Sequence, residues 1–285
     1  MSRLSIRKTY KLFIGGAFPR SESGRSYEVL DKEGNFIANP AMASRKDARD
    51  AVVAARAAFP GWSGATAFNR SQILYRVAEL MESRRDEFID EVSLCEAIGK
   101  GKAGKAVDAA IDRWVWYAGW SDKLGSILGA TNPVAGPYYN FSIPEPVGVV
   151  ALIAPQDSSL LGLIDLLGAA LTTGNTVVVL ANEMAPLPAI TLSEVLATSD
   201  VPGGVVNMLT GRTKEVTPWL ASHMDVDAIN LAGVAAEDVK ALAMEATDNL
   251  KRVITPKPRN WLKTPTLEAM TSLLEVKTVW HPIGV

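Results

Sequence analysis

The chain has 285 residues, a formal net charge of −2 and a charged content of 21%. No cluster of Lys or Arg stands out, so these values exclude the electrostatic footprint of a nucleic-acid-binding protein. Cys95 is the single cysteine, which excludes a disulfide within the chain and favours a cytoplasmic location. The N-terminus is polar, and the longest apolar stretch, residues 146–171, is interrupted by Pro155 and Asp165 among others. We therefore expect neither a signal peptide nor a membrane-spanning segment.

The N-terminal part is predicted to combine short strands with a series of helices. Residues 10–18 and 25–38 are typical of short strands joined by glycine-containing turns. Ser44, followed three residues later by Asp47, predicts an N-cap and an acidic first turn for the first helix. Further helices are expected at about residues 66–84, 85–97 and 102–124.

The expected helix at 102–124 carries an aromatic cluster of Trp114, Trp116, Tyr117 and Trp120. Such a cluster could line a ligand cage. At helical spacing, however, aromatic side chains far more often pack in a core or an interface. We therefore interpret the cluster as packing.

Four apolar runs between residues 145 and 233 organise the rest of the chain. Continuous runs of this kind are typical of strands buried on both faces, and strands that alternate with helices predict a parallel sheet. Gly174, which precedes Asn175, is typical of a left-handed helix C-cap. The expected strands are 147–154, 176–181, 204–209, 226–231 and 251–255, with helices at 159–173, 187–198, 213–222 and 235–248. The fold class is therefore α/β, a Rossmann-like doubly wound parallel sheet whose ligand crevice lies at the strand C-termini.

Two segments around this sheet have a different character. Residues 126–144 contain glycines and prolines followed by YYNFSI, which predicts a projecting hairpin. After Val253 the sequence ITPKPRNWLKTP contains three prolines and can continue neither a helix nor a central strand. The last segment, LEVKTVWH, alternates as a strand does and places one set of residues on a common face, namely Leu274, Val276, Thr278 and Trp280.

Several blocks of this sequence resemble the aldehyde dehydrogenase superfamily. The likeness rests on EPVGVVALIAP, ALTTGNTVVVL, VPGGVVNMLTG and HMDVDAINLAG, which are similar, in order, to blocks of that family's coenzyme domain. The tail LLEVKTVW is similar to its C-terminal oligomerisation strand. The resemblance implies N-terminal strands and helices at 1–125, an oligomerisation hairpin at 126–144, a Rossmann-like region at 145–255, and a linker with the C-terminal strand at 256–285.

The residues after IAP depart from the family pattern. There the family usually has Trp-Asn-Phe-Pro, whose Asn donates to the oxyanion formed on the substrate, whereas this chain has QDSS at 156–159. An ionised Asp157 only accepts hydrogen bonds and would repel a developing oxyanion. We interpret Asp157 and Ser158 as caps of the next helix.

The first block of the coenzyme site also departs from the family pattern. Where the family has Lys-Pro-Ser/Ala-Glu, the chain has LANE at 180–183. The resemblance implies that Glu183 could still accept a hydrogen bond from a ribose hydroxyl, whereas Leu180 offers no donor.

The second block of the coenzyme site also lacks residues that would favour binding of the coenzyme. Where the family has Phe-Thr-Gly-Ser before a helix under the pyrophosphate, the chain has LAGV at 231–234. Glu237 and Asp238 follow in the first turns of that helix, where carboxylates satisfy the dipole and disfavour a phosphate. We therefore expect no bound cofactor.

No catalytic residue and no metal site is predicted. In the family, NLKRV-like residues precede a Glu-Leu-Gly-Gly strand with the general base, and a Cys nucleophile follows in a separate catalytic domain. Here NLKRV at 249–253 leads directly to the linker and the C-terminal strand, so we expect the catalytic domain to be absent. Cys95 is interpreted as a buried structural thiol. His223 and His281 are isolated, so neither a Cys/His pair nor a metal set is expected.

These observations together predict a protein that is not an enzyme. We expect a non-catalytic aldehyde dehydrogenase homologue, similar to the non-catalytic second half found in family-16 enzymes. Its expected role is that of a structural or regulatory subunit of a full-length, active NAD(P)-dependent aldehyde dehydrogenase. The interface with this partner would be formed by the C-terminal strand through Leu274, Val276, Thr278 and Trp280.

Two other functions stay open at this point. One is a nucleotide-binding sensor that retains weak dinucleotide affinity through Glu183 and Gly233. The other is an aldehyde oxidoreductase of altered chemistry that uses Asp157. Because the fold is common to all three alternatives, it does not decide among them.

Overall fold

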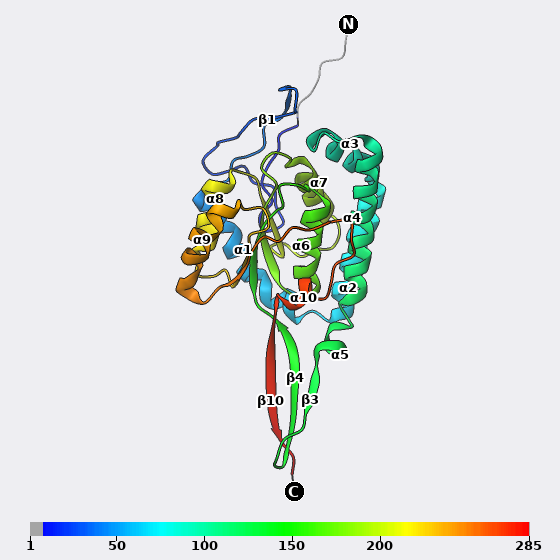
Figure 1. Ribbon diagram of the computed structural model, residues 1–285, viewed down its shortest axis with the longest axis vertical. Coiled ribbons are helices and arrows are strands. Elements are labelled where there is room, and N and C mark those ends of the chain that lie inside the picture. The colour runs from blue at the N-terminus through cyan, green and yellow to red at the C-terminus, as the bar shows by residue number, and fades with distance from the viewer. Residues whose placement is uncertain (1–7, 285) are drawn as a thin grey trace.

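A parallel five-stranded sheet forms the centre of the protein, whose computed structural model describes residues 8–284 (Figure 1). Its strand order is β7-β6-β5-β8-β9, and every neighbouring pair is parallel. The strands are β5 (Val149–Ile153), β6 (Thr176–Leu180), β7 (Val206–Leu209), β8 (Ala228–Asn230) and β9 (Arg252–Ile254). Every residue of β5, β6, β7 and β8 is buried, which confirms the interpretation of the apolar runs and the α/β fold class.

Helices cover both faces of this sheet. One apolar core joins one face to α2 (Ala67–Ser83), α3 (Arg85–Cys95), α4 (Lys100–Trp120), α6 (Leu161–Thr172) and α7 (Leu187–Leu196). A second core joins the other face to α1 (Arg45–Gly64), α8 (Thr213–Ala221) and α9 (Ala236–Glu245), with a 3₁₀ turn (Ala246–Asn249) after α9. All residues of α6 are buried, because this helix packs between the sheet and α4.

Local sequence signals explain where two of these helices begin or end. Ser44 caps α1 by accepting from the Asp47 backbone amide, and the Asp47 side chain accepts in return from the Ser44 amide, which completes a capping box. After α6, Gly174 adopts φ 89°, which confirms the left-handed C-cap.

The aromatic cluster of α4 is part of the core. Trp114 and Tyr117 are fully buried, and the Trp116 ring contacts Tyr117 edge-on at a centroid distance of 4.9 Å. The Tyr117 ring also fills the space beside Gly168 of α6, where an added Cβ would lie 2.2 Å from a ring carbon. The packing interpretation is therefore confirmed.

The strands expected near the N-terminus are shorter than predicted. Only β1 (Val29–Leu30) and β2 (Phe36–Ala38) form a two-stranded sheet. Most of residues 10–28 lies outside regular strands, with turns and single bridges such as Phe13 to Met208 at the β7 edge of the main sheet. The segment thus pairs through isolated bridges instead of a continuous ladder.

A second sheet projects from the body, at the lower end of Figure 1. The chain enters it through the short helix α5 (Leu124–Leu128), and its strands are β3 (Ala130–Asn132), β4 (Tyr138–Pro146) and β10 (Leu274–Pro282). The order is β10-β4-β3, and β10 pairs antiparallel with β4 along its whole length. The C-terminal segment is a strand, as predicted, and it leaves the body beside β4; within residues 8–284 no strand pairs with its outer edge.

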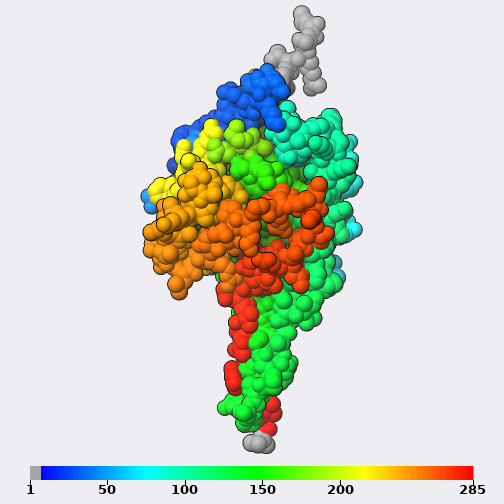
Figure 2. Space-filling view, in the orientation of Figure 1, coloured from blue at the N-terminus to red at the C-terminus, as the bar shows by residue number. Residues whose placement is uncertain are grey.

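Residues 255–267, which we call the strap, cross the face of α6 between β9 and the short helix α10 (Glu268–Thr271) (Figure 2). A buried carboxylate fixes the strap. Asp165 of α6 pairs with Arg113 of α4 and, at 2.5 Å, with Arg259 of the strap. Arg113 also donates to the backbone carbonyls of Trp261 and Lys263 at 3.1 and 2.9 Å.

Within residues 8–284, no helix combines the length and apolar character that a membrane crossing requires.

One buried carboxyl makes the fold sensitive to pH. Glu91 of α3 accepts from the Thr191 hydroxyl of α7 at 2.8 Å, while its second carboxyl oxygen is buried without a hydrogen-bond partner. Burial raises the pKa of Glu91 to about 7, and Glu87 adds to this effect. In the unfolded chain the carboxyl ionises near its ordinary value of 4.5. The stability that protonated Glu91 contributes is therefore complete below that value and is lost as the pH rises to about 7.

We predict that Glu91→Gln, which keeps the neutral form, stabilises the protein by about 1–2 kcal/mol at pH 8 and has little effect at pH 4.5. Urea unfolding at both pH values measures this difference. Glu82→Gln, which neutralises an exposed carboxylate just before α3, is the matched control and should shift stability equally at the two pH values. A pH-independent effect of Glu91→Gln would contradict the prediction.

Candidate functional site

The order of the strands locates the candidate site at the carboxyl end of the sheet. The chain starts at β5, winds outward through β6 and β7, and returns to β8 on the other side of β5. In doubly wound sheets, ligands bind where the strand order reverses, outside the strand C-termini. Here that point lies between the loops that follow β5 and β8.

These two loops are in direct contact. The Gly233 amide donates to the Ile153 carbonyl at 3.0 Å, and a Cβ on Gly233 would lie 1.9 Å from the Ala154 carbonyl oxygen. The side-chain amide of Gln156 donates to the Ala154 carbonyl at 2.8 Å and accepts from the Glu183 amide at 3.1 Å. Glycine at position 233 is thus required by the approach of the two backbones, whether or not a ligand binds.

The polar residues after β5 have different partners. Ser158 accepts from the Gly162 amide at 3.0 Å, so the interpretation of Ser158 as a cap of α6 is confirmed. For Asp157 it is wrong, because its carboxylate accepts instead from the indole N–H of Trp261 at 3.1 Å. The Asp157 side chain therefore attaches the strap to the carboxyl end of β5.

Glu183 is engaged by its own fold. Its two carboxylate oxygens accept from the Thr213 amide, at the start of α8, and from the Arg212 guanidinium, each at 2.8 Å. Partial burial raises the pKa of Glu183, but the hydrogen bonds from Thr213 and Arg212 outweigh burial and hold the pKa below its usual range. The carboxylate that could accept from a ribose serves as an ionised helix cap.

The neighbouring positions offer little to a phosphate. Leu180 is fully buried at the end of β6, and Val234 is buried before α9. Glu237 and Asp238 occupy the first turn of α9, as expected from the sequence. Lys214 lies 3.8 Å from Asp238, so the nearby cation already faces a carboxylate.

The cysteine and the two histidines lie on separate elements of the structure. Cys95 ends α3 and packs with Leu187 and Ile190, and burial, followed by Glu91, raises the pKa of its thiol to about 12. His223 accepts from the Asp225 amide, while His281 lies exposed on β10. Across residues 8–284 no group of three His, Cys, Asp or Glu side chains is arranged to hold a metal ion.

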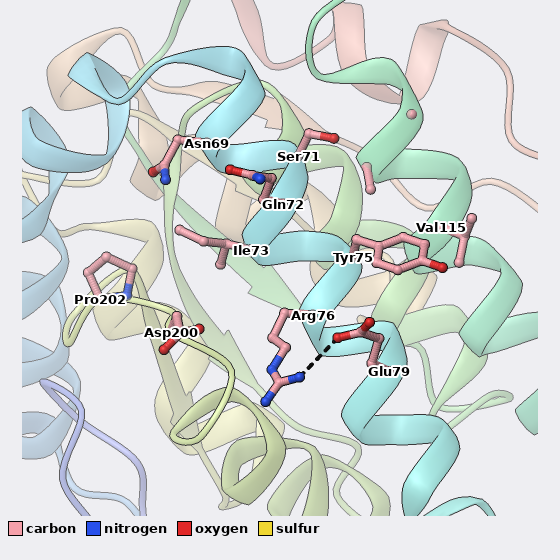
Figure 3. A pocket seen from close by; sticks show the side chains of 12 residues that line it. Asn69, Ser71, Gln72, Ile73, Tyr75, Arg76, Glu79, Val115, Asp200 and Pro202 are labelled. Carbon is pink, nitrogen blue, oxygen red and sulfur yellow. Dashed lines mark hydrogen bonds and ion pairs between the residues drawn. The ribbon is translucent and has the colours of Figure 1, made fainter.

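A large open groove lies elsewhere, on the outside of α2 and α4 (Figure 3). This groove of about 1010 Å³ is open, and its charged pair, Arg76 and Glu79, is joined at 3.1 Å. Tyr75, Val115 and Asp200 complete its mixed lining. Among its lining residues the structure shows no hydroxyl hydrogen-bonded to a carboxylate, so we do not take it as the candidate site.

A smaller cavity of about 470 Å³ lies under the strap. It reaches the carboxyl ends of β8 and β9 at Asn230 and Ile254, and Asp165 lies in its floor. Sequence reasoning missed this cavity and the ion pairs that build it. Asp165 could have indicated them, because a carboxylate in an otherwise apolar helix has to be paired with a buried cation.

The predicted interface residues of β10 lie on one face of the projecting sheet. Leu274, Val276, Thr278 and Trp280 stand opposite Pro146, Pro144, Ser142 and Asn140 of β4, respectively. Val276 is 71% exposed and Trp280 is 57% exposed, although the Trp280 ring contacts Tyr138 edge-on. Thr278 shares a hydrogen bond of 2.9 Å with Ser142. Their role toward a partner stays a prediction.

Comparison with known proteins shows which family has a similar sequence. Residues 18–255 match the aldehyde dehydrogenase family. Mitochondrial benzaldehyde dehydrogenase of Antirrhinum majus is 34% identical over 251 residues, which cover 85% of this chain and 46% of that protein. Cytosolic 10-formyltetrahydrofolate dehydrogenase of Mus musculus is 32% identical over 265 residues, covering 89% of this chain and 29% of that protein.

Solved structures give the same result. The NAD⁺ complex of an aldehyde dehydrogenase from Bacillus cereus superposes with a TM-score of 0.82 and 29% identity, over 87% of this chain and 50% of that one. The chain thus spans half or less of the length of these relatives. Because the match includes both the parallel sheet and the helices before it, this chain belongs to the aldehyde dehydrogenase family.

Proposed function

We propose that this chain is a non-catalytic member of the aldehyde dehydrogenase family that acts as a structural or regulatory subunit of a full-length, active NAD(P)-dependent aldehyde dehydrogenase. Its nearest functional parallel would be the non-catalytic second half of family-16 enzymes. The proposal assigns the chain a role in assembly and none in chemistry.

One observation carries the proposal: the polar groups at the carboxyl end of the sheet serve the fold itself. Glu183 caps α8, Asp157 holds Trp261, and Gln156 joins the loops after β5 and β6. A dinucleotide site needs donors for its phosphates and a free acceptor for its ribose. Each of these groups would have to leave an internal partner before it could bind a dinucleotide.

The projecting sheet supports the assembly role. Its edge strand β10 has no strand on its outer side within residues 8–284, and it exposes Val276 and Trp280. An exposed apolar edge strand is an aggregation hazard unless another sheet covers it. A partner that accepts β10 as an added strand would satisfy both the backbone groups and these side chains.

A nucleotide-binding sensor is the second candidate. Its support is that Glu183 remains partly exposed, with 23% of its side chain accessible, at the carboxyl end of the sheet, and that the similar structure from Bacillus cereus is an NAD⁺ complex. An oxidoreductase of altered chemistry would need Asp157 to act on a substrate, and that carboxylate already accepts from Trp261. Direct titration separates these alternatives.

We predict that NAD⁺ and NADP⁺ bind to the chain with a Kd of about 1 mM or weaker. Two or three lost or repulsive contacts of about 1–3 kcal/mol each would move a micromolar site into that range. Isothermal titration calorimetry measures the affinity, with a full-length aldehyde dehydrogenase as positive control. Micromolar binding that weakens in Glu183→Gln would instead establish the sensor.

We also predict that the 285-residue chain oxidises no aldehyde with either nicotinamide cofactor. Its one thiol, Cys95, is held protonated at neutral pH by burial and by Glu91, and a protonated thiol is a poor nucleophile. Absorbance at the reduced-nicotinamide band gives the rate for the wild type and for Cys95→Ala. Turnover that disappears in Cys95→Ala would refute the assignment of Cys95 as structural.

We predict that Trp280→Lys lowers the amount of aldehyde dehydrogenase that co-purifies with the chain at least tenfold. The substitution replaces the largest apolar side chain of the proposed interface with a charged one. His281→Lys is the matched control, because His281 is adjacent in sequence but lies on the opposite face of β10, and it should change recovery less than twofold. Mass spectrometry of the purified native complex gives both values.

A truncation provides an independent check of the interface. Removing residues 275–285 should abolish co-purification and leave the circular dichroism of the α/β body intact. The cut preserves Met270 and Leu273, which are buried in the main core. If the truncated chain still retains the dehydrogenase with unchanged affinity, β10 is not the interface.

A further inference from the structure

The cavity under the strap has walls of fixed shape. Its floor is α6, with Asp165, Leu166 and Ala169, and its outer wall is the strap. The Arg113 guanidinium reaches from α4 to both walls, since it pairs with Asp165 and donates to the carbonyls of Trp261 and Lys263. The cavity is therefore part of the folded structure and does not depend on the crevice between β5 and β8.

The charged side chains around the cavity leave positive charge available. Lys257 is matched by Glu268 at 3.1 Å, and Arg259 is matched by Asp165 through one of its nitrogens. Asp165 is also shared with Arg113, so two guanidinium groups face one buried carboxylate. Lys263 lines the cavity and pairs with no carboxylate among residues 8–284. The lining itself therefore holds three cations and two carboxylates, an excess of one positive charge, and Arg113 adds a further cation behind Asp165.

The remaining lining is apolar or weakly polar. Ile254, Leu273 and Ala169 contribute aliphatic surface, and the Trp261 indole contributes an aromatic wall with the Arg259 guanidinium 5.1 Å from its ring centroid. The volume of about 470 Å³ is within the range of small-molecule sites, which combine an apolar lining with a few polar groups. Asn230 and Asn260 add amide groups to the lining.

We propose that this cavity binds a small organic carboxylate, whose charged end contacts Lys263 and the free nitrogens of Arg259 and whose apolar body lies against Trp261 and Ile254. A carboxylate fits because guanidinium and ammonium groups form charge-assisted hydrogen bonds with it. A dianionic phosphate fits less well, because the apolar walls at Ile254 and Trp261 offer no partner for charged oxygens on its other sides. Binding of this carboxylate requires neither a bound nucleotide nor a partner dehydrogenase.

Isothermal titration calorimetry of the full chain with sodium benzoate tests the proposal, with sodium phosphate at equal ionic strength as the comparison anion. We expect saturable benzoate binding in the millimolar range or tighter, and binding about tenfold weaker in Lys263→Ala. Lys240→Ala, which removes an exposed lysine of α9 outside the cavity, is the control and should change the affinity less than twofold.

Fluorescence provides a second readout at the same site. Benzoate saturation should change the tryptophan emission of the wild type, and Trp261→Phe should remove that change while the other tryptophans remain. The proposal is overturned if benzoate shows no saturable binding, if Lys263→Ala binds it as tightly as the wild type, or if phosphate binds equally well at equal ionic strength. None of these outcomes depends on whether the chain pairs with a dehydrogenase.

Discussion

The ion pairs of one buried carboxylate hold together parts of the chain that are distant in sequence. Asp165 is fully buried in α6, and the two guanidinium groups that neutralise it come from α4 and from the strap. A buried pair of this kind adds little net stability over apolar packing, but removing one partner leaves an uncompensated charge at a cost of about 3–5 kcal/mol. Asp165 therefore acts mainly as a constraint. It specifies where the strap lies and so fixes both the cavity beneath it and the position of Trp261 beside Asp157.

The same constraint extends to the projecting sheet. The strap leads into α10, where Met270 and Leu273 enter the main core, and β10 begins at the next residue. Arg252 of β9 donates to the carbonyls of Ser272 and Leu274 and pairs with Glu275 at 2.6 Å, so the root of β10 is attached to the edge of the main sheet. The exposed part of β10 thus leaves the body in one direction, beside β4, and presents Val276 and Trp280 on a defined face.

Elements with a strong local cause could be predicted from the sequence, and contacts between distant segments could not. The buried strands follow from unbroken apolar runs, the start of α1 from Ser44 and Asp47, and the end of α6 from Gly174, because each signal lies within a few residues of its effect. Asp157 was misread for the complementary reason. A carboxylate before a helix is a good local cap, but the partner that it binds, Trp261, lies in the strap. The sequence shows that Asp165 needs a cation, yet only the fold reveals which arginines supply it.

The proposed functions follow from how each polar group of the carboxyl end is partnered. Family membership fixes the scaffold, and the chemistry belongs to the groups that remain free on it. At the crevice between β5 and β8, the acceptors are engaged and the donors are few, because Glu183 caps α8 and Lys214 faces Asp238. On the other face of the sheet, under the strap, cations outnumber carboxylates and apolar walls surround them. A nucleotide that binds at the crevice would have to break existing contacts. A small carboxylate that binds under the strap would instead pair with a cation that lacks a carboxylate partner within the described part of the chain. The proposed loss of nucleotide affinity therefore rests on this balance of internal partners more than on the loss of any single family residue.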